Sequence, residues 1–179
     1  ETTSRELSPV IFEINSHASD FSSLLKPIIS PIRGHAYDGI VGIGGCDKNL
    51  PGLMMGMVRC NVPSIFLFGG SALPGKWRGK DVSVLDAFEA VGAFMNNEIS
   101  LEELDQLERV CLPTTGACAG QFTANTMGMV AEALGLSPLG SSMIPNVYDA
   151  RNVMAATAGE IVMRSINNLS LIHISEPTR

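Results

Sequence analysis

The chain has 179 residues, of which 45% are hydrophobic and 17% charged, the composition of a globular protein long enough to bury one core. Its formal net charge of −6 argues against a surface for nucleic acid or anionic membranes, and its 4 cysteines are too few for a disulfide scaffold, so we expect a reducing compartment. No apolar run reaches the ~18 residues of a membrane span, and we expect neither a span nor a signal peptide.

Both ends of the chain differ in character from the middle. Residues 1–33 contain two Ser-Pro pairs that interrupt a weak helical spacing, so we expect loose packing there. Residues 169–179 (LSLIHISEPTR) break the pattern of the preceding helix and read as a translated sequencing adapter, with a frayed natural tail as the alternative. We expect a fragment of a longer protein in which 34–168 form the partial domain.

From residue 34 the pattern predicts a βαβ unit. Two short apolar runs that end in glycine, 40–44 and 64–68, are typical of buried strands. A helix from Pro51 to about Asn61 separates them, so the strands are predicted to be parallel neighbours. The end of the second strand, 69–71, should then lie beside the end of the first.

The rest of the chain alternates loops and helices. The expected elements are a polar loop at 73–80, a helix at 83–95, a helix at 101–110 capped by Ser100 and Glu103, a turn at 112–120, a helix stopped by Gly135, and a last helix at 146–167. The fold class is therefore α/β, a three-layer domain with a parallel sheet built from βαβ units.

The turn after the first of these strands places a thiol, a carboxylate and an amine side by side. They are Cys46, Asp47 and Lys48, at the strand end where open α/β sheets bind ligands. Gly44 and Gly45 are expected to adopt backbone conformations that other residues resist and to leave room for something bulky.

Cys46 and Cys118 share one context, because each stands in a glycine-rich turn before a helix. Such loops present thiolates to iron–sulfur clusters. The two cysteines are 72 positions apart, however, so spacing alone also allows small buried thiols. Cys60 is expected to be a core thiol, and Cys111 a helix-end packing residue or a spare ligand.

Other polar residues have two interpretations each. Asp47 is a hard oxygen ligand that could hold a metal, whereas a salt bridge to Lys48 is the default. His35 is lone and is expected to be structural, with a catalytic role as the alternative. The basic residues of 76–80 could receive a substrate carboxylate, and a solvated loop explains them equally well.

Four segments carry a resemblance to a known family. They are GHAYDG (34–39), GGCDKNLPG (44–52), PSIFLFGG (63–70) and GACAGQFTANTM (116–127), the last followed by AEALGLS. In this order they resemble the dihydroxy-acid dehydratase and phosphogluconate dehydratase family over about 34–168. FTANTM with the later SSMIP is more similar to the dihydroxy-acid type than to its sugar-acid relatives.

The resemblance implies a hydro-lyase of branched-chain amino-acid biosynthesis that converts a 2,3-dihydroxy carboxylic acid to a 2-keto acid. An iron–sulfur cluster ([2Fe–2S] or [4Fe–4S]) acts as a Lewis acid on the leaving 3-hydroxyl. By motif match Cys46 and Cys118 are cluster ligands, Asp47 binds Mg²⁺, and Lys48 is a catalytic lysine that can be carbamylated to become an oxygen ligand. It also implies a homodimer that acts on a small molecule in the bacterial cytoplasm or an organelle.

The chain also departs from the family pattern. A third cluster cysteine and a second metal carboxylate belong upstream of residue 34, where we suspect a misread over 8–33, and the serine base belongs to a C-terminal domain. Cys111 stands one position away from a Cys-Pro pair of the relatives. We expect the fragment alone to be inactive. A sugar-acid dehydratase of the same family and a non-enzymatic α/β binding module are the alternatives.

Overall fold

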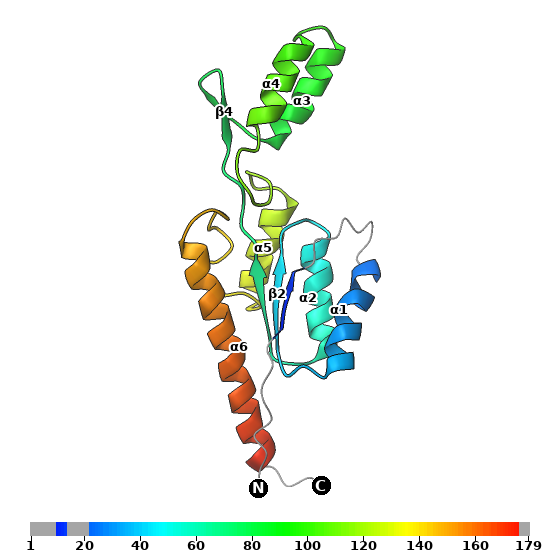
Figure 1. Ribbon diagram of the computed structural model, residues 1–179, viewed down its shortest axis with the longest axis vertical. Helices are drawn as coiled ribbons and strands as arrows, with labels where there is room; N and C mark the ends of the chain where they lie inside the picture. The colour runs from blue at the N-terminus through cyan, green and yellow to red at the C-terminus, as the bar shows by residue number, and fades with distance from the viewer. Residues whose placement is uncertain (1–9, 14–21, 176–179) are drawn as a thin grey trace.

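The structure, a computed structural model, describes the backbone of residues 10–13 and 22–175 and the side chains of 25–168. In chain order its elements are β1 (Val10–Glu13), α1 (Ser22–His35), β2 (Ile40–Gly44), α2 (Asn49–Cys60), β3 (Ser64–Phe68), β4 (Gly75–Trp77), β5 (Lys80–Val82), α3 (Val84–Met95), α4 (Leu101–Val110), α5 (Thr123–Ala133) and α6 (Ala150–Ser175). Figure 1 shows how they are arranged.

A parallel sheet with strand order β1-β2-β3 forms the centre of the molecule. β2 and β3 pair in register from Ile40 with Ser64 to Gly44 with Phe68, and α2 connects them. The predicted βαβ unit is therefore confirmed. The predicted end of α2 is also confirmed, because Asn61 caps it in a left-handed conformation.

Helices lie on both sides of this sheet because successive strand residues face opposite ways. On one side Ile40, Phe66 and Phe68 join a core with residues of α1, α2 and α5. On the other side Val41 and Ile65 pack against α6. Figure 1 shows α6 on one side of the strands and α1 and α2 on the other. The α/β class with a parallel sheet is confirmed.

The expectation of loose packing before residue 34 is wrong for α1. This helix is continuous although it contains Pro27 and Pro31. Ile28 and Ile32 are buried, and a Cβ on Gly56 of α2 would lie 2.8 Å from Ile28. The close contact between α1 and α2 stabilises a helix that proline alone would disfavour. The first nine residues lie outside the described part of the chain, and the suspected misread stays a prediction.

The expected polar loop at 73–80 is in fact mostly a β-hairpin. β4 and β5 pair antiparallel, with Trp77 opposite Lys80. The two loop residues, Arg78 and Gly79, both have positive φ, as a two-residue hairpin of the mirror-image turn type requires. Arg-Gly is not the usual sequence for this turn, which is why the pattern did not predict it.

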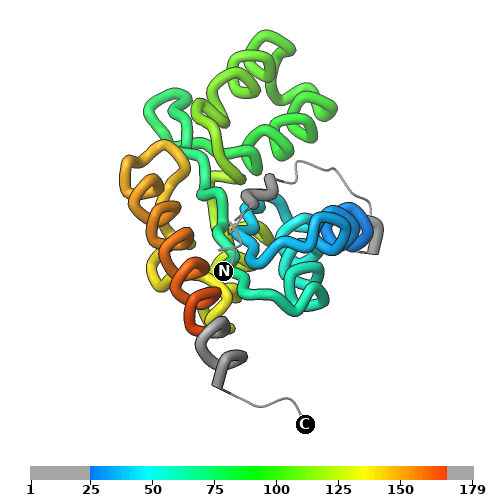
Figure 2. The backbone as a smooth tube through the Cα atoms, turned by 60° about the horizontal axis from the view of Figure 1, so that its bottom comes forward, coloured from blue at the N-terminus to red at the C-terminus, as the bar shows by residue number. Residues whose placement is uncertain are grey.

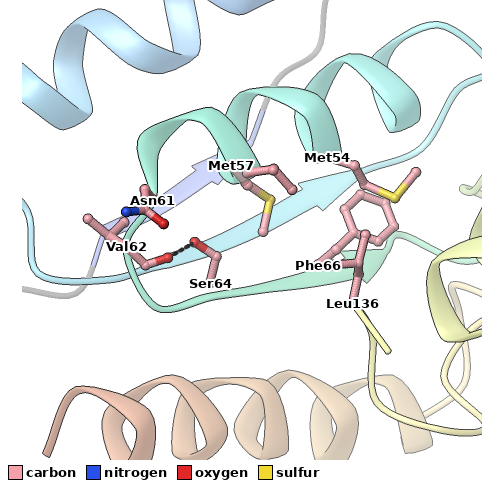
Figure 3. Close-up of a pocket in the computed structure, with 8 residues that line it drawn as sticks. Met54, Met57, Asn61, Val62, Ser64, Phe66 and Leu136 are labelled. Atoms are coloured by element: carbon pink, nitrogen blue, oxygen red, sulfur yellow. Dashed lines mark hydrogen bonds between the residues drawn. The ribbon is translucent and has the colours of Figure 1, made fainter. Parts of the chain in front are cut away.

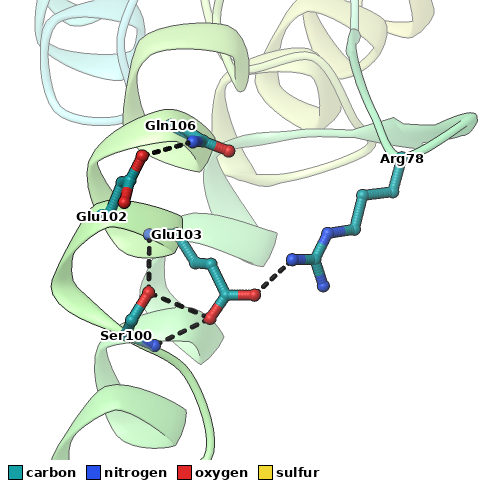
Figure 4. A network of polar contacts seen from close by, with 5 residues as sticks. All are labelled: Arg78, Ser100, Glu102, Glu103 and Gln106. Atoms are coloured by element: carbon teal, nitrogen blue, oxygen red, sulfur yellow. Dashed lines mark hydrogen bonds and ion pairs between the residues drawn. The ribbon is translucent and has the colours of Figure 1, made fainter.

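α3 and α4 form an antiparallel helix pair that stands away from the sheet, at the top of Figure 1 and again apart in Figure 2. α4 begins after the predicted capping residue Ser100, and α3 begins after Ser83, a second capping residue that was not predicted from the sequence. The side chains of Ser83 and Ser100 accept backbone N–H groups, and Asp86 and Glu103 accept in return from the cap residues. Figure 4 shows the second of these boxes and the ion pair that joins Glu103 to Arg78 of the hairpin.

The last helix begins later in the chain than predicted, and it also ends later. α6 starts at Ala150 rather than at 146 and continues to Ser175. Because no side chain after residue 168 is described, the predicted non-native tail at 169–179 stays a prediction. In the part of the chain that the structure describes, no helix combines the length and apolar character needed to cross a membrane.

Candidate functional site at the carboxyl end of the sheet

Cys46, Asp47 and Lys48 form the turn between β2 and α2. The Cys46 amide donates to Oδ1 of Asn49 at 2.9 Å, and the Cys46 carbonyl accepts from the Leu50 amide at 3.0 Å. The turn is thus tied to the first residues of α2, while the Cys46 side chain stays exposed. Its thiol is presented at the carboxyl end of the sheet, as predicted.

The two glycines before this cysteine do not behave as expected. Neither Gly44 nor Gly45 has a positive φ, so the expectation of an unusual backbone is wrong. A Cβ on Gly45 would meet no atom within 4 Å outside its two chain neighbours, which leaves open space at Gly45 itself. The room that was predicted is present, although the special conformation is not.

The second cysteine turn is joined to the end of β3. The amide of Ala117 donates to the carbonyl of Gly70 at 2.8 Å, and the amide of Ala72 donates to the carbonyl of Ala117 at 2.6 Å. Ser71 and Ala117 form an isolated parallel bridge. Cys118 is the next residue and is partly buried.

One hydrogen-bonded path connects the two turns. The amide of Gly69 donates to the carbonyl of Gly44 at 2.8 Å, and the carbonyl of the next residue, Gly70, accepts from the amide of Ala117. The segment 69–71 therefore lies between the turn of Cys46 and the turn of Cys118. The prediction that the end of the second strand lies beside the end of the first is confirmed, and both cysteine turns stand at one edge of the sheet.

The charge environment also links the two thiols. The Cys46 thiol is exposed overall but loses part of its hydration to neighbouring atoms, and this partial desolvation is the first cause that raises its pKa above the ordinary value. Hydrogen bonding to the Asp47 carboxylate and the nearby charges of Asp47 and Cys118 raise this pKa further, against the lowering effect of the Asp47 amide. Cys118 is thus close enough to influence the titration of Cys46.

Asp47 lies between the thiol and the amine. Its Oδ1 is 3.5 Å from Cys46 Sγ, and its Oδ2 is 3.3 Å from Lys48 Nζ. Both Asp47 and Lys48 remain about half-exposed. The default salt bridge is therefore present, and its carboxylate and amine stay open to solvent next to the thiol.

Three asparagines that sequence reasoning missed hold this edge together. Asn49 receives the Cys46 amide, and the buried Asn125 donates through Nδ2 to the Cys118 carbonyl at 3.0 Å and to the Gly120 carbonyl. Asn146 donates to the Gly69 carbonyl at 2.8 Å. For Asn49 and Asn125 the available signal was an amide side chain in the first turn of the helix that follows each cysteine, whereas Asn146 lies in a turn before α6 and had no such signal.

The other residues considered from the sequence lie elsewhere. His35 stacks on Tyr37 at the opposite edge of the sheet, before β2 begins. Cys60 packs against the core near the end of α2. Cys111 is buried between α3 and α4, with its thiol 3.4 Å from the Glu108 carbonyl, so the packing interpretation is confirmed.

Two of the three basic residues at 76–80 pair with acidic residues of this chain. Lys76 lies 2.8 Å from Asp81, and Arg78 pairs with Glu103 and stacks over Trp77. These pairs favour a structural role over a substrate-binding one.

A cavity of about 240 Å³ is present on the far side from the cysteine turns. Figure 3 shows Met54, Met57, Phe66 and Leu136 around it, near the start of β3. Its lining is mainly apolar, and it shares no residue with the two turns. It is therefore separate from the candidate site.

The donor set fits part of a metal centre. Two thiols at one edge, open space at the glycine that precedes one of them and a neighbouring carboxylate suit an iron–sulfur cluster and a hard cation. Among the residues that the structure describes, no three His, Cys, Asp or Glu side chains are grouped closely enough to hold a metal ion.

Comparison with known proteins gives a consistent family. The model of the family described as "Dihydroxy-acid/6-phosphogluconate dehydratase N-terminal" matches residues 24–176, which includes the last part of 1–33. "Dihydroxy-acid dehydratase 3" of Bradyrhizobium diazoefficiens is 51% identical over 173 residues, which cover 92% of this chain and 30% of that protein.

Two further relatives agree. "Dihydroxy-acid dehydratase 2" of Bordetella bronchiseptica is 55% identical over 75% of this chain and 24% of its own length. "Dihydroxy-acid dehydratase" of the archaeon Metallosphaera sedula is 43% identical over 87% of this chain and 29% of its own length. The chain thus spans between about a quarter and a third of these curated relatives. With the family model covering most of it, the chain belongs to the dihydroxy-acid/6-phosphogluconate dehydratase family, in the N-terminal region.

Proposed function

We propose that the full-length protein is a hydro-lyase of the dihydroxy-acid dehydratase type, which removes water from a 2,3-dihydroxy carboxylic acid and yields a 2-keto acid for branched-chain amino-acid biosynthesis. The names of the relatives support this choice. The observation that carries it is the hydrogen-bonded path from Gly44 through 69–71 to Ala117, which joins two cysteine turns at one sheet edge.

Cys46 and Cys118 are proposed to be two ligands of an iron–sulfur cluster. Both thiols belong to turns whose backbone is fixed by buried asparagines, so the sulfurs are held in place before any cluster binds. When bound, the cluster would supply a Lewis acid for the leaving hydroxyl, and Mg²⁺ a hard cation for the substrate carboxylate. The further thiolate and the base are expected from other parts of the full-length protein.

Asp47 and Lys48 are proposed to serve the cation. Asp47 offers carboxylate oxygens within 3.5 Å of the Cys46 sulfur, so a cation on Asp47 would be adjacent to the cluster. Lys48 lies against Asp47 with its amine half-exposed, where CO₂ can reach it and form a carbamate. The carbamate would replace a positive charge with an oxygen ligand, which suits a cation better than an ammonium.

The proposed setting follows from the same family membership. The intact protein would be a two-domain homodimer in the bacterial cytoplasm or an organelle, and the sheet with helices on both faces would form one three-layer domain. Dihydroxyisovalerate is the expected substrate. The word 6-phosphogluconate in the family description supports a sugar acid as the second candidate.

The test is a keto-acid assay on the full-length protein, purified without oxygen and supplied with Mg²⁺. Dihydroxyisovalerate should give product, gluconate and 6-phosphogluconate should give little, and the 179-residue chain alone should give none. Preference for the sugar acids would favour the second candidate. An iron-loaded protein that dehydrates none of these acids would contradict the proposal, and so would turnover by the short chain.

A further inference from the structure

The side chain of Asn125 contacts the backbone of the second cysteine turn at two points. Its Nδ2 donates to the Cys118 carbonyl at 3.0 Å and also to the Gly120 carbonyl. Asn125 is the third residue of α5 and only 7% exposed, so both bonds are made in the interior. The two N–H groups of the side-chain amide are thereby used.

The oxygen of the same amide shows that its orientation is fixed. Oδ1 of Asn125 is buried, and no group in the described part of the chain donates to it. Rotation of the amide by 180° would give no relief, because it would set Oδ1 against two carbonyl oxygens. Asn125 therefore holds the two carbonyls although its own acceptor is left unsatisfied. Buried groups left in this state are rare, and functional sites are one place where they are kept.

The two bonds also decide where the neighbouring backbone amides point. The described chain has no cis peptide bond, so the N–H of each peptide group points opposite to its C=O. Because the carbonyls of Cys118 and Gly120 point at Asn125, the N–H groups of Ala119 and Gln121 point away from it. Among the described residues, neither of these N–H groups has a hydrogen-bond acceptor.

These two amides lie on the open side of the turn. Gln121 is exposed and Ala119 partly exposed, whereas Asn125 on the other side is buried. The N-cap residue of α5, Phe122, makes no side-chain cap, so the positive end of that helix adds to the same region. Cys118 belongs to this turn and is itself partly exposed. The turn thus presents a thiol together with amide donors that the described chain does not use.

We propose that Asn125 is a positioning residue for the iron–sulfur cluster, which turns the amides of Ala119 and Gln121 toward the cluster so that they donate to its sulfurs. These sulfurs carry negative charge, and N–H donors beside them stabilise the more negative, reduced form. Asn125 would thus raise the reduction potential of the cluster as well as hold Cys118 in place. The inference rests on the cluster of the proposed function and assigns its hydrogen bonds.

The test compares the cluster's reduction potential in variants of the full-length protein, each reconstituted without oxygen from iron and sulfide. Asn125→Ala removes both side-chain donors and frees the two peptide groups to rotate, so its midpoint potential should be more negative than the parent's. Ser137→Ala is the matched control, because the buried, neutral Ser137 also donates to a carbonyl, that of Phe66, at 2.6 Å. The control should lose stability and keep the parent's potential.

Resonance Raman spectra in H₂O and D₂O report on the N–H···S bonds themselves. The iron–sulfur bands of the parent should shift on deuterium exchange. This shift should shrink in Asn125→Ala and persist in Ser137→Ala. If Asn125→Ala fails to bind a cluster, an ester in place of the Ala119 amide removes one donor and leaves Asn125 intact. The ester variant should then show the more negative potential.

The outcomes separate this inference from the proposed function. A cluster in Asn125→Ala, or in the ester variant where it replaces it, with the parent's potential and deuterium shift would overturn the role of Asn125. A control shifted as far as Asn125→Ala would overturn it too, because loss of stability alone would then explain the change. A full-length parent that binds no cluster would contradict the proposed cluster site, whereas a loaded parent without dehydratase activity would contradict only the proposed reaction.

Discussion

The amide of Ala117 donates a hydrogen bond of 2.8 Å to the carbonyl of Gly70, and this bond fixes where Cys118 lies. Gly70 follows β3, whose end is itself bonded to the end of β2 through Gly69 and Gly44. Residues 72 positions apart in the chain are thereby brought to one edge of a sheet. The relative position of the two cysteine turns is therefore set by backbone hydrogen bonds of neighbouring residues.

Substitution of Gly116 should break this contact. Gly116 has a φ of +128°, and a Cβ there would overlap the backbone of Ser71 and Ala72. We expect Gly116→Ala to lower the free energy of unfolding by about 2 kcal/mol or more and to reduce iron incorporation. Thermal unfolding and iron analysis of the full-length protein measure the two effects.

Gly45→Ala is the matched control for that experiment. Gly45 also precedes a cysteine, directly before Cys46, but its φ is not positive and there is open space where a Cβ would lie. The variant should unfold at the parent's temperature. If Gly116→Ala were as stable as Gly45→Ala, the close approach of residues 71 and 116 would be wrong.

The side-chain amide nitrogen of Asn125 should contribute to the stability of the fold. Nδ2 donates to the carbonyls of Cys118 and Gly120, and the side chain is buried. Asn125→Asp keeps the shape but replaces the donor with a charged acceptor that faces two carbonyl oxygens. We expect Asn125→Asp to lower the free energy of unfolding by about 3 kcal/mol. Asn125→Ala should lower it by about 1–3 kcal/mol, and denaturant unfolding measures both values. An aspartate variant that is more stable than the alanine variant would contradict this hydrogen-bond assignment.

Glu132 should make the 140–142 loop sensitive to acid. Burial tends to raise the pKa of Glu132, but hydrogen bonds from Ser142, Gly140 and Ser141 together hold this pKa below its ordinary value of 4.5. Because the folded pKa is the lower one, the ionised side chain stabilises the fold above about pH 4.5. That contribution disappears as the pH falls through the folded pKa.

Glu132→Gln tests this dependence. At pH 7 the variant should be about 1–2 kcal/mol less stable, because an NH₂ group replaces the oxygen that accepts from the Gly140 amide at 3.0 Å. The difference between parent and variant should narrow as the pH is lowered below about 4.5. Parallel stability curves across this pH range would show that the carboxylate charge plays no part.

The sequence predicted those parts of the fold that local patterns determine. The apolar runs that became β2 and β3, and the Ser100–Glu103 capping box, each have a signature within a few residues. The α1 helix was missed because two prolines disfavour it locally, and its packing on Gly56 is a tertiary effect. The β4–β5 hairpin was missed because Arg78 adopts a positive φ, which is unusual for an arginine.

The two cysteine turns could be located from the sequence, whereas the contacts that hold them together could not, and the roles of their residues stay predictions. Cys46 and Cys118 stand in glycine-rich turns that can be recognised in the sequence. Their approach depends on Gly70 and Ala117, two small residues whose pairing has no local signal. The roles of Asn125 and Asn146 likewise follow from which carbonyls lie opposite them in three dimensions.

The most direct test of the proposed cluster site is anaerobic reconstitution of the full-length protein with iron and sulfide, followed by visible absorbance. Cys46→Ser and Cys118→Ser should each lose most of the absorbance of the parent, whereas Cys60→Ser, a thiol packed against the core at the far end of α2, should retain it. Full absorbance in both of the first two variants would contradict the account, because neither sulfur would then be a ligand.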